Sequence, residues 1–145
     1  MNRRENMRKL GIDYGEARAG IAITDELQIT IQGVETIHHK GNDKVLLKRL
    51  DEILMQYPQV DTIVVGMPLN MNGTKGSRAE ITESFVHKLK CKYNKLKIET
   101  IDERLTTVQA HKTMNDLEVH KQKKKNIVDT LAAIYILETY MGQNE

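Results

Sequence analysis

Three acidic side chains, far apart in the sequence, occupy positions where a carboxylate is costly. Asp13 lies inside an apolar strand-like run, Glu103 directly follows another such run, and Asp129 lies in the first turns of a strongly apolar helix-like segment. Aspartate is depleted in strands, and a buried charge needs a partner. Three carboxylates that meet repel one another unless cations hold them. All-oxygen ligands select hard ions such as Mg²⁺ or Mn²⁺, and two such ions about 4 Å apart suit phosphodiester hydrolysis. The three acids therefore predict a two-ion nuclease site, an ester-bond hydrolase.

Each acid also has a purely structural interpretation. Asp13 could cap the turn that follows its strand, and Asp129 could stabilise the start of its helix through the helix dipole. Glu103 and its neighbour Asp102 could form an acidic loop paired with Arg104. Because adjacent side chains alternate in direction, only one of these two acids is expected to enter the site. We favour Glu103 and keep Asp102 as the alternative.

Hydrophobic periodicity predicts the elements that position the acids. A hairpin at 10–25, whose first strand begins at Arg8, is followed by a third strand at 28–37 and by strands at 60–66 and 96–101. Helices are expected at 43–57, 77–92, 106–115 and 126–141, with a basic linker at 120–125. Capping boxes at 77–80 and 106–109 mark two helix starts. This order predicts an α/β domain with a mixed five-stranded sheet flanked by helices. The last helix carries small residues beside its acid, Ala132 and Ala133, so it can approach the sheet closely.

Length and composition indicate one globular domain. We expect a flexible basic leader at 1–7, the domain at 8–141 and a short tail at 142–145 of the 145 residues. The net charge is +2, so the positions of the charges matter more than their sum. The single cysteine allows no intramolecular disulfide, and no apolar run approaches the roughly 18 residues of a membrane span. These features predict a cytoplasmic protein that does not bind membranes.

Four motifs give a more specific indication. They are GIDYG with RAGIA at 11–22, VVGMPLNMNGTKGSRAE at 64–80, DERLTT at 102–107 and KKNIVDTLAA at 124–133. In these motifs the chain resembles the YqgF/RuvX family of RNase H-like proteins, described as Holliday junction resolvases or pre-16S rRNA nucleases. The resemblance implies an RNase H-like sheet and a divalent-metal nuclease site at Asp13, Glu103 and Asp129. It also implies processing of the 5′ end of pre-16S rRNA, a step of ribosome biogenesis, in the bacterial cytoplasm. Ala17 replaces a usual lysine, and Ser77 a common proline.

Basic residues beside the acids are candidates for holding substrate phosphates. They are Arg18, Lys75, Arg78, Arg104 and Lys124. The structural alternatives are a solvated lysine surface at 121–125 and an arginine paired with a carboxylate. With few aromatic residues for base stacking, we expect recognition by backbone shape and charge, with strong salt dependence.

Several functions and partners are compatible with these residues. The first is nuclease action on structured nucleic acid, with precursor rRNA favoured and ribosomal particles as possible partners. The alternatives are cleavage of four-way DNA junctions and a non-catalytic RNA-binding role in ribosome assembly. An actin-like ATPase would need two such domains around a cleft, whereas this chain holds one. We expect a monomer or a homodimer.

Overall fold

Five strands form one mixed sheet in this computed structural model, which describes residues 7–105 and 121–143, except for the side chains of residues 105 and 121–129. The strands are β1 (Arg8–Tyr14), β2 (Arg18–Thr24), β3 (Ile31–His38), β4 (Val60–Met67) and β5 (Lys97–Asp102). Their spatial order is β3-β2-β1-β4-β5. The β1–β2 and β2–β3 pairs are antiparallel, whereas β1–β4 and β4–β5 are parallel. The predicted mixed five-stranded sheet is confirmed.

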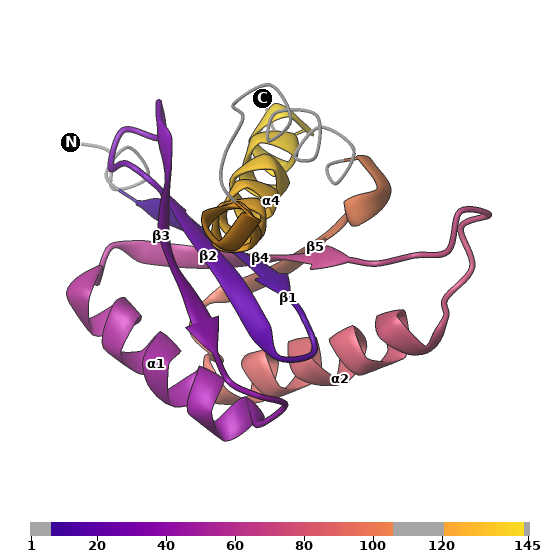
Figure 1. Cartoon of the computed structure of the whole chain (residues 1–145). Helices are drawn as coiled ribbons and strands as arrows, with labels where there is room; N and C mark the ends of the chain where they lie inside the picture. Colours follow the sequence, from indigo (N-terminus) through magenta and orange to yellow (C-terminus); the bar gives the residue numbers. More distant parts are fainter. Residues whose placement is uncertain (1–6, 106–120, 144–145) are drawn as a thin grey trace.

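Helices cover both faces of the sheet (Figure 1). α1 (Asp43–Gln56) and α2 (Ser77–Lys92) pack on one face, where Leu50 and Phe85 join the larger hydrophobic core. Of the described helices, only α4 (Lys121–Gln143) packs on the other face, where Ile136 and Leu137 form a second core with Val64. No helix in the described ranges is both long and apolar enough to cross a membrane.

α4 lies unusually close to the sheet because glycines face it. A Cβ atom on Gly11 of β1 would lie 2.9 Å from the Ala133 carbonyl oxygen and 2.7 Å from Leu137 Cγ. A Cβ on Gly66 of β4 would lie 2.6 Å from Ile136 Cδ1. Ordinary van der Waals contact begins near 3.4 Å, so a side chain at Gly11 would press on the helix backbone, and one at Gly66 would displace the Ile136 side chain. The predicted close approach of the helix face bearing Ala133 is confirmed.

Two predicted boundaries were wrong. β3 begins at Ile31, not at residue 28, because the Asp25 carboxylate accepts hydrogen bonds from the backbone N–H groups of Ile29 and Thr30 and prolongs the turn. α4 begins at Lys121, so residues 121–125 are helical and not a linker.

α2 begins at Ser77, as predicted, but the capping at its start differs from the prediction. Gly76 is its N-cap and makes no side-chain capping bond, so the predicted capping box at 77–80 does not form. The predicted helix at 106–115, with its own capping box, lies outside the described residues.

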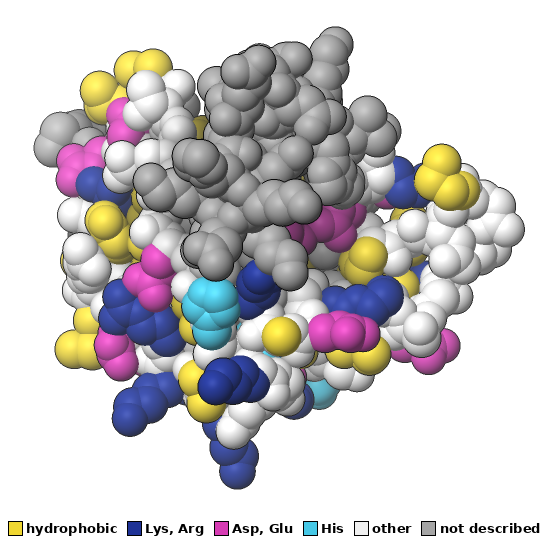
Figure 2. Space-filling model, viewed as in Figure 1, with side chains coloured by type: hydrophobic (Ala, Val, Ile, Leu, Met, Phe, Trp, Pro, Cys, Tyr) yellow, Lys and Arg dark blue, Asp and Glu magenta, His cyan; other side chains and the backbone are white. Residues whose placement is uncertain are grey.

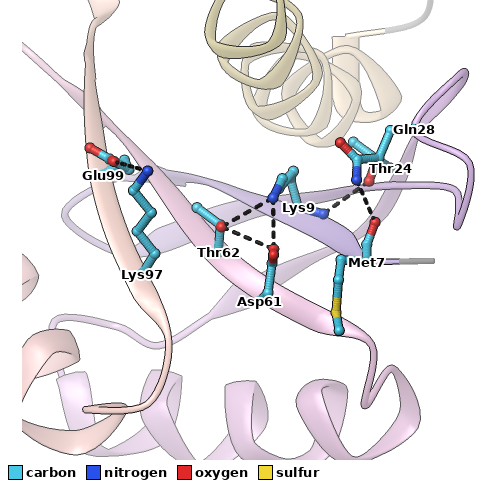
Figure 3. A network of polar contacts seen from close by, with 8 residues as sticks. All are labelled: Met7, Lys9, Thr24, Gln28, Asp61, Thr62, Lys97 and Glu99. Carbon is cyan, nitrogen blue, oxygen red and sulfur yellow. Dashed lines mark hydrogen bonds and ion pairs between the residues drawn. The ribbon is translucent and has the colours of Figure 1, made fainter. Parts of the chain in front are cut away.

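A polar network ties the amino ends of the parallel strands together (Figure 3). The Lys9 ammonium donates to Asp61 Oδ1 at 2.8 Å and to Thr62 Oγ1 at 3.4 Å. Lys97 forms an ion pair with Glu99 at 3.0 Å on neighbouring β5. Each cation in this network has an acidic partner, so the network stabilises the sheet at the end opposite to the one described next.

Candidate active site

Asp13 lies near the carboxyl end of β1, on the sheet face that α4 covers. Leu10 and Ile12 point into the core beneath α1 and α2, so alternation places Gly11 and Asp13 on the opposite face. In the register with β2, the partner of Asp13 is Gly20, which has no side chain to solvate a carboxylate. Burial raises the pKa of the Asp13 carboxyl well above its usual value.

Glu103 meets Asp13 at this end of the sheet. It is the first residue after β5 and opens the short 3₁₀ helix η2 (Glu103–Leu105). Gly66 of β4 faces it, since a Cβ there would lie 3.4 Å from the Glu103 carboxyl carbon, at ordinary contact distance. Hydrogen bonding and negative charge from Glu103 are, after burial, the next causes that raise the Asp13 pKa. Two carboxylates this close repel each other, so the pair favours a proton or a cation.

Asp102 is engaged elsewhere. Its oxygens accept hydrogen bonds from the Arg104 guanidinium at 2.6 and 3.0 Å, and these bonds lower the pKa of the Asp102 carboxyl. The same guanidinium donates from Nη1 to the Met71 backbone carbonyl at 3.1 Å. Of the two adjacent acids, the structure therefore places Glu103 beside Asp13 and pairs Asp102 with Arg104.

Asp129 lies on α4, and its side chain is outside the described part of the chain. The course of the helix can still be followed on either side of it. Thr130 lies against Gly33 of β3, Ala133 lies on Gly11 of β1, and Tyr140 lines a hollow with Lys9 at the amino end of β1. Among the described side chains, no three acidic, histidine or cysteine residues form a group able to hold a metal ion. The third carboxylate thus stays a prediction.

Arg78 is a cation whose charge reaches the acid pair. It lies in the first turn of α2 and donates from Nη2 to the Tyr14 backbone carbonyl at 3.1 Å. Its charge acts on Asp13 and opposes the rise of the Asp13 pKa. Arg78 Nη1 is buried and has no hydrogen-bond partner among the described residues; the nearest acid oxygen, Glu16 Oε1, is 3.9 Å away. This unsatisfied donor beside two acids could bind a phosphate oxygen.

The remaining predicted phosphate ligands are more dispersed. Lys75 forms an ion pair with Glu83 at 2.7 Å, and Arg104 is held as described above. Arg18 is the first residue of β2, opposite His38 of β3 in the register. The Lys124 side chain lies outside the described residues.

Sequence reasoning missed the support behind Asp13. The next residue, Tyr14, stacks on Phe85 with ring centroids 4.2 Å apart and donates its hydroxyl to Asp43 at 2.6 Å. His39 is buried, stacks on Tyr14 and hydrogen-bonds the Gly15 carbonyl at 3.0 Å. A tyrosine directly after the acid and a histidine pair after β3 were the available signals. Together these contacts fix the turn that ends β1.

The chain is similar to known proteins over nearly its whole length. A protein of Ruminiclostridium cellulolyticum named "Putative pre-16S rRNA nuclease" is 50% identical over 137 residues, which cover 94% of this chain and 95% of that protein. A protein of the same name from Acetivibrio thermocellus is 47% identical over 135 residues, 93% of this chain and 95% of that protein.

Solved structures show the fold. The fowlpox virus Holliday junction resolvase matches with a TM-score of 0.59 at 14% identity, covering 96% of this chain and 100% of that chain. Thermus thermophilus RuvC in complex with a Holliday junction substrate matches with a TM-score of 0.56 at 12% identity, covering 94% and 96%. The sheet and its helices are RNase H-like, as expected.

A family model covers nearly the whole chain. It is the model for RuvX, described as Holliday junction resolvase, and it matches residues 7–143. That range includes both acids of the pair, the glycines beneath α4 and the helix that carries Asp129. The chain belongs to the RuvX family, a family of nucleases.

Proposed function

We propose that this protein is a divalent-metal-dependent nuclease that hydrolyses phosphodiester bonds in structured nucleic acid, and that it processes the 5′ end of pre-16S rRNA in the cytoplasm. The observation that carries the proposal is the pairing of Asp13 and Glu103, both half-buried, at the carboxyl ends of β1 and β5. In open α/β sheets, ligands bind beyond the carboxyl ends of the strands. The names of the two relatives support the rRNA substrate.

The donor set fits a hard cation. The two described acids offer only oxygen ligands, and Asp129 would complete a set of three carboxylates. Mg²⁺ or Mn²⁺, as two ions, suits such ligands, whereas zinc prefers nitrogen and sulfur. Ions bound there would supply an activated water and charge stabilisation for the leaving oxygen. A cation would also replace the proton that the Asp13–Glu103 pair otherwise needs.

The remaining residues of the site would bind the nucleic acid backbone. Arg78 acts on Asp13 through its charge and has a buried donor with no partner among the residues that the structure describes, so it is the first candidate to orient the scissile phosphate. Arg18, Lys75, Arg104 and Lys124 would add contacts along the strand. We expect binding to weaken steeply with salt, as for any phosphate-directed contact.

A four-way DNA junction is the second candidate substrate. The description of the RuvX family and the likeness to two junction-resolving proteins favour it. The chemistry at the acids would be the same, so only the bound nucleic acid distinguishes the two candidates. A homodimer would match the symmetry of a four-way junction, whereas a monomer would suit cleavage within a ribosomal precursor particle.

One preparation can test both candidates. The protein is incubated with labelled RNA carrying the 5′ end of pre-16S rRNA and with a synthetic DNA junction, each with Mn²⁺ or with chelator. We expect Mn²⁺-dependent cleavage of the RNA, with Asp13→Asn and Glu103→Gln each reducing the rate by about 10³-fold or more. Asp61→Asn, at the opposite end of the sheet, serves as the matched acid control and should cut normally.

The other outcomes separate the alternatives. Junction cleavage without RNA cleavage would favour the resolvase. Binding of RNA without any cleavage would indicate a non-catalytic assembly factor. If Asp102→Asn abolishes cleavage and Glu103→Gln does not, the assignment of Glu103 is wrong.

A further inference from the structure

The connection between β4 and α2, which we call the tip loop (residues 68–76), projects from the body of the domain (Figure 1). Hydrogen bonds within the loop hold it in one conformation. The Asn70 backbone N–H donates to the Thr74 carbonyl at 2.9 Å, and the Gly73 N–H donates to the Asn70 carbonyl at 2.8 Å. The Thr74 hydroxyl donates to Asn72 Oδ1 at 2.6 Å. Gly73 turns the chain with a φ of +86°, a conformation that favours glycine.

An arginine fixes this loop to the active-site end of the sheet. Arg104 Nη1 donates to the Met71 carbonyl at 3.1 Å, and the Arg104 guanidinium also donates to both carboxylate oxygens of Asp102. Arg104 directly follows Glu103, and the loop itself leaves β4 just after Gly66, the glycine that faces Glu103. The position of the tip is therefore tied to the position of the acid pair.

The side chain at the tip is apolar and points to solvent. Met71 is 91% exposed, more than any other large hydrophobic residue described as exposed. Figure 2 shows yellow hydrophobic surface on the projecting loop. An exposed methionine adds no core packing, so folding gives no reason for an apolar group on a fixed support. The five tyrosines and the single phenylalanine are all buried or half-buried, so none is presented to a base as Met71 is.

We propose that Met71 is a wedge that inserts between bases where a helix of the substrate is interrupted, at a branch or a helix end. The inference rests on the proposed nuclease function and adds a specificity-determining residue to it. Methionine is among the apolar side chains that proteins insert into base steps, and the step must be partly unstacked to receive it. Unstacking two neighbouring bases costs least at a branch, where the stack is already interrupted. A wedge therefore selects structured sites without reading their sequence. Asn70 and Asn72 beside the tip could hydrogen-bond the displaced base edges.

Two assays test the wedge. In the first, the non-cutting variant Glu103→Gln is titrated into RNA and DNA junctions that carry 2-aminopurine at the branch, whose fluorescence rises when the base unstacks. We expect the fluorescence rise to be largely lost when the Glu103→Gln protein also carries Met71→Ala. The rise should be kept when it carries Met71→Leu instead. Met55→Ala is the matched control, because Met55 is 81% exposed on α1, far from the acids in the fold.

The second assay measures cleavage by the active protein. We expect Met71→Ala to lower kcat/KM on branched substrate by about 10-fold or more and to leave unstructured single strands within about 2-fold. Equal melting temperatures for the two methionine variants would show that the fold is intact. A fluorescence response from the RNA junction, the DNA junction or both supports the wedge and identifies the substrate.

Three results would overturn the proposal. These are an unchanged fluorescence rise with Met71→Ala, an equal loss with Met55→Ala, and an equal loss of cleavage on branched and unstructured strands. Absence of cleavage by the unmodified protein would refute the nuclease function instead, and the fluorescence assay would still report on Met71.

Discussion

Gly11→Ala is the sharpest test of the idea that α4 must lie close to the sheet for catalysis. The new Cβ would lie 2.9 Å from the Ala133 carbonyl oxygen, against about 3.4 Å for ordinary contact. The Leu137 side chain can rotate away, but the carbonyl belongs to the helix backbone. The helix must therefore move outward by about half an ångström. Such overpacking costs about 1–3 kcal/mol, which lowers the melting temperature of a domain of this length by roughly 4–12 °C.

The same shift should reach the chemistry. Asp129 lies one helical turn before Ala133, so displacing the helix displaces its backbone relative to Asp13. A misplacement of about 1 Å costs roughly 10²-fold in rate, so half of that should cost about 10-fold in kcat with little change in KM. Gly142→Ala is the matched control, since a Cβ there has no atom within 4 Å. Unchanged melting and cleavage in Gly11→Ala would refute the close-packing argument. A lower melting temperature with full activity would remove Asp129 from the mechanism.

Three further predictions concern charges. Because burial raises the pKa of Asp13, the folded state disfavours its ionised form: the stability it contributes is present at low pH and lost as pH rises through the raised pKa. Asp13→Asn should therefore have a higher melting temperature than the wild type at pH 7 in chelator. This difference should disappear near pH 4, and Mn²⁺ should not raise the melting temperature of the variant. Lys9→Met leaves Asp61 without its ammonium and should cost about 1 kcal/mol in denaturant unfolding, with cleavage unchanged. Arg104→Lys cannot make the two-oxygen contact with Asp102, so limited proteolysis should cut the tip loop faster and branched substrates should be cleaved more slowly than unstructured ones.

Much of the fold could be predicted because local patterns and long-range packing agree. α1 and α2 begin where their periodicity starts, and the small face at Ala133 does lie on the sheet. Errors arose where a side chain competed with the backbone pattern. The Asp25 carboxylate binds two backbone N–H groups and delays β3, although the intervening residues alternate like a strand.

The site was harder to predict than the elements that carry it. Alternation could indicate that Asp102 and Glu103 point apart, but it could not say which one meets Asp13. That choice depends on β4 lying between β1 and β5, which is a property of the assembled sheet. The tip loop could be recognised as a loop from its glycines. Its attachment through Arg104 could not, because the contact joins residues 33 positions apart.

The surroundings of Asp13 explain why a cation is the expected partner. Its strand partner is Gly20, Gly66 faces Glu103, and Gly11 lets α4 lie close above the same face. These residues allow tight packing but offer no side-chain donors to a carboxylate. Arg78 supplies one positive charge, and its buried Nη1 has no hydrogen-bond partner in the described part of the chain, so it does not neutralise both acids. A carboxylate pair in such a setting is neutralised by a proton or by a metal ion. Asp13 thus lowers the stability of the fold. An aspartate that only capped a turn would not do so, because a cap is stabilised by its own backbone contacts.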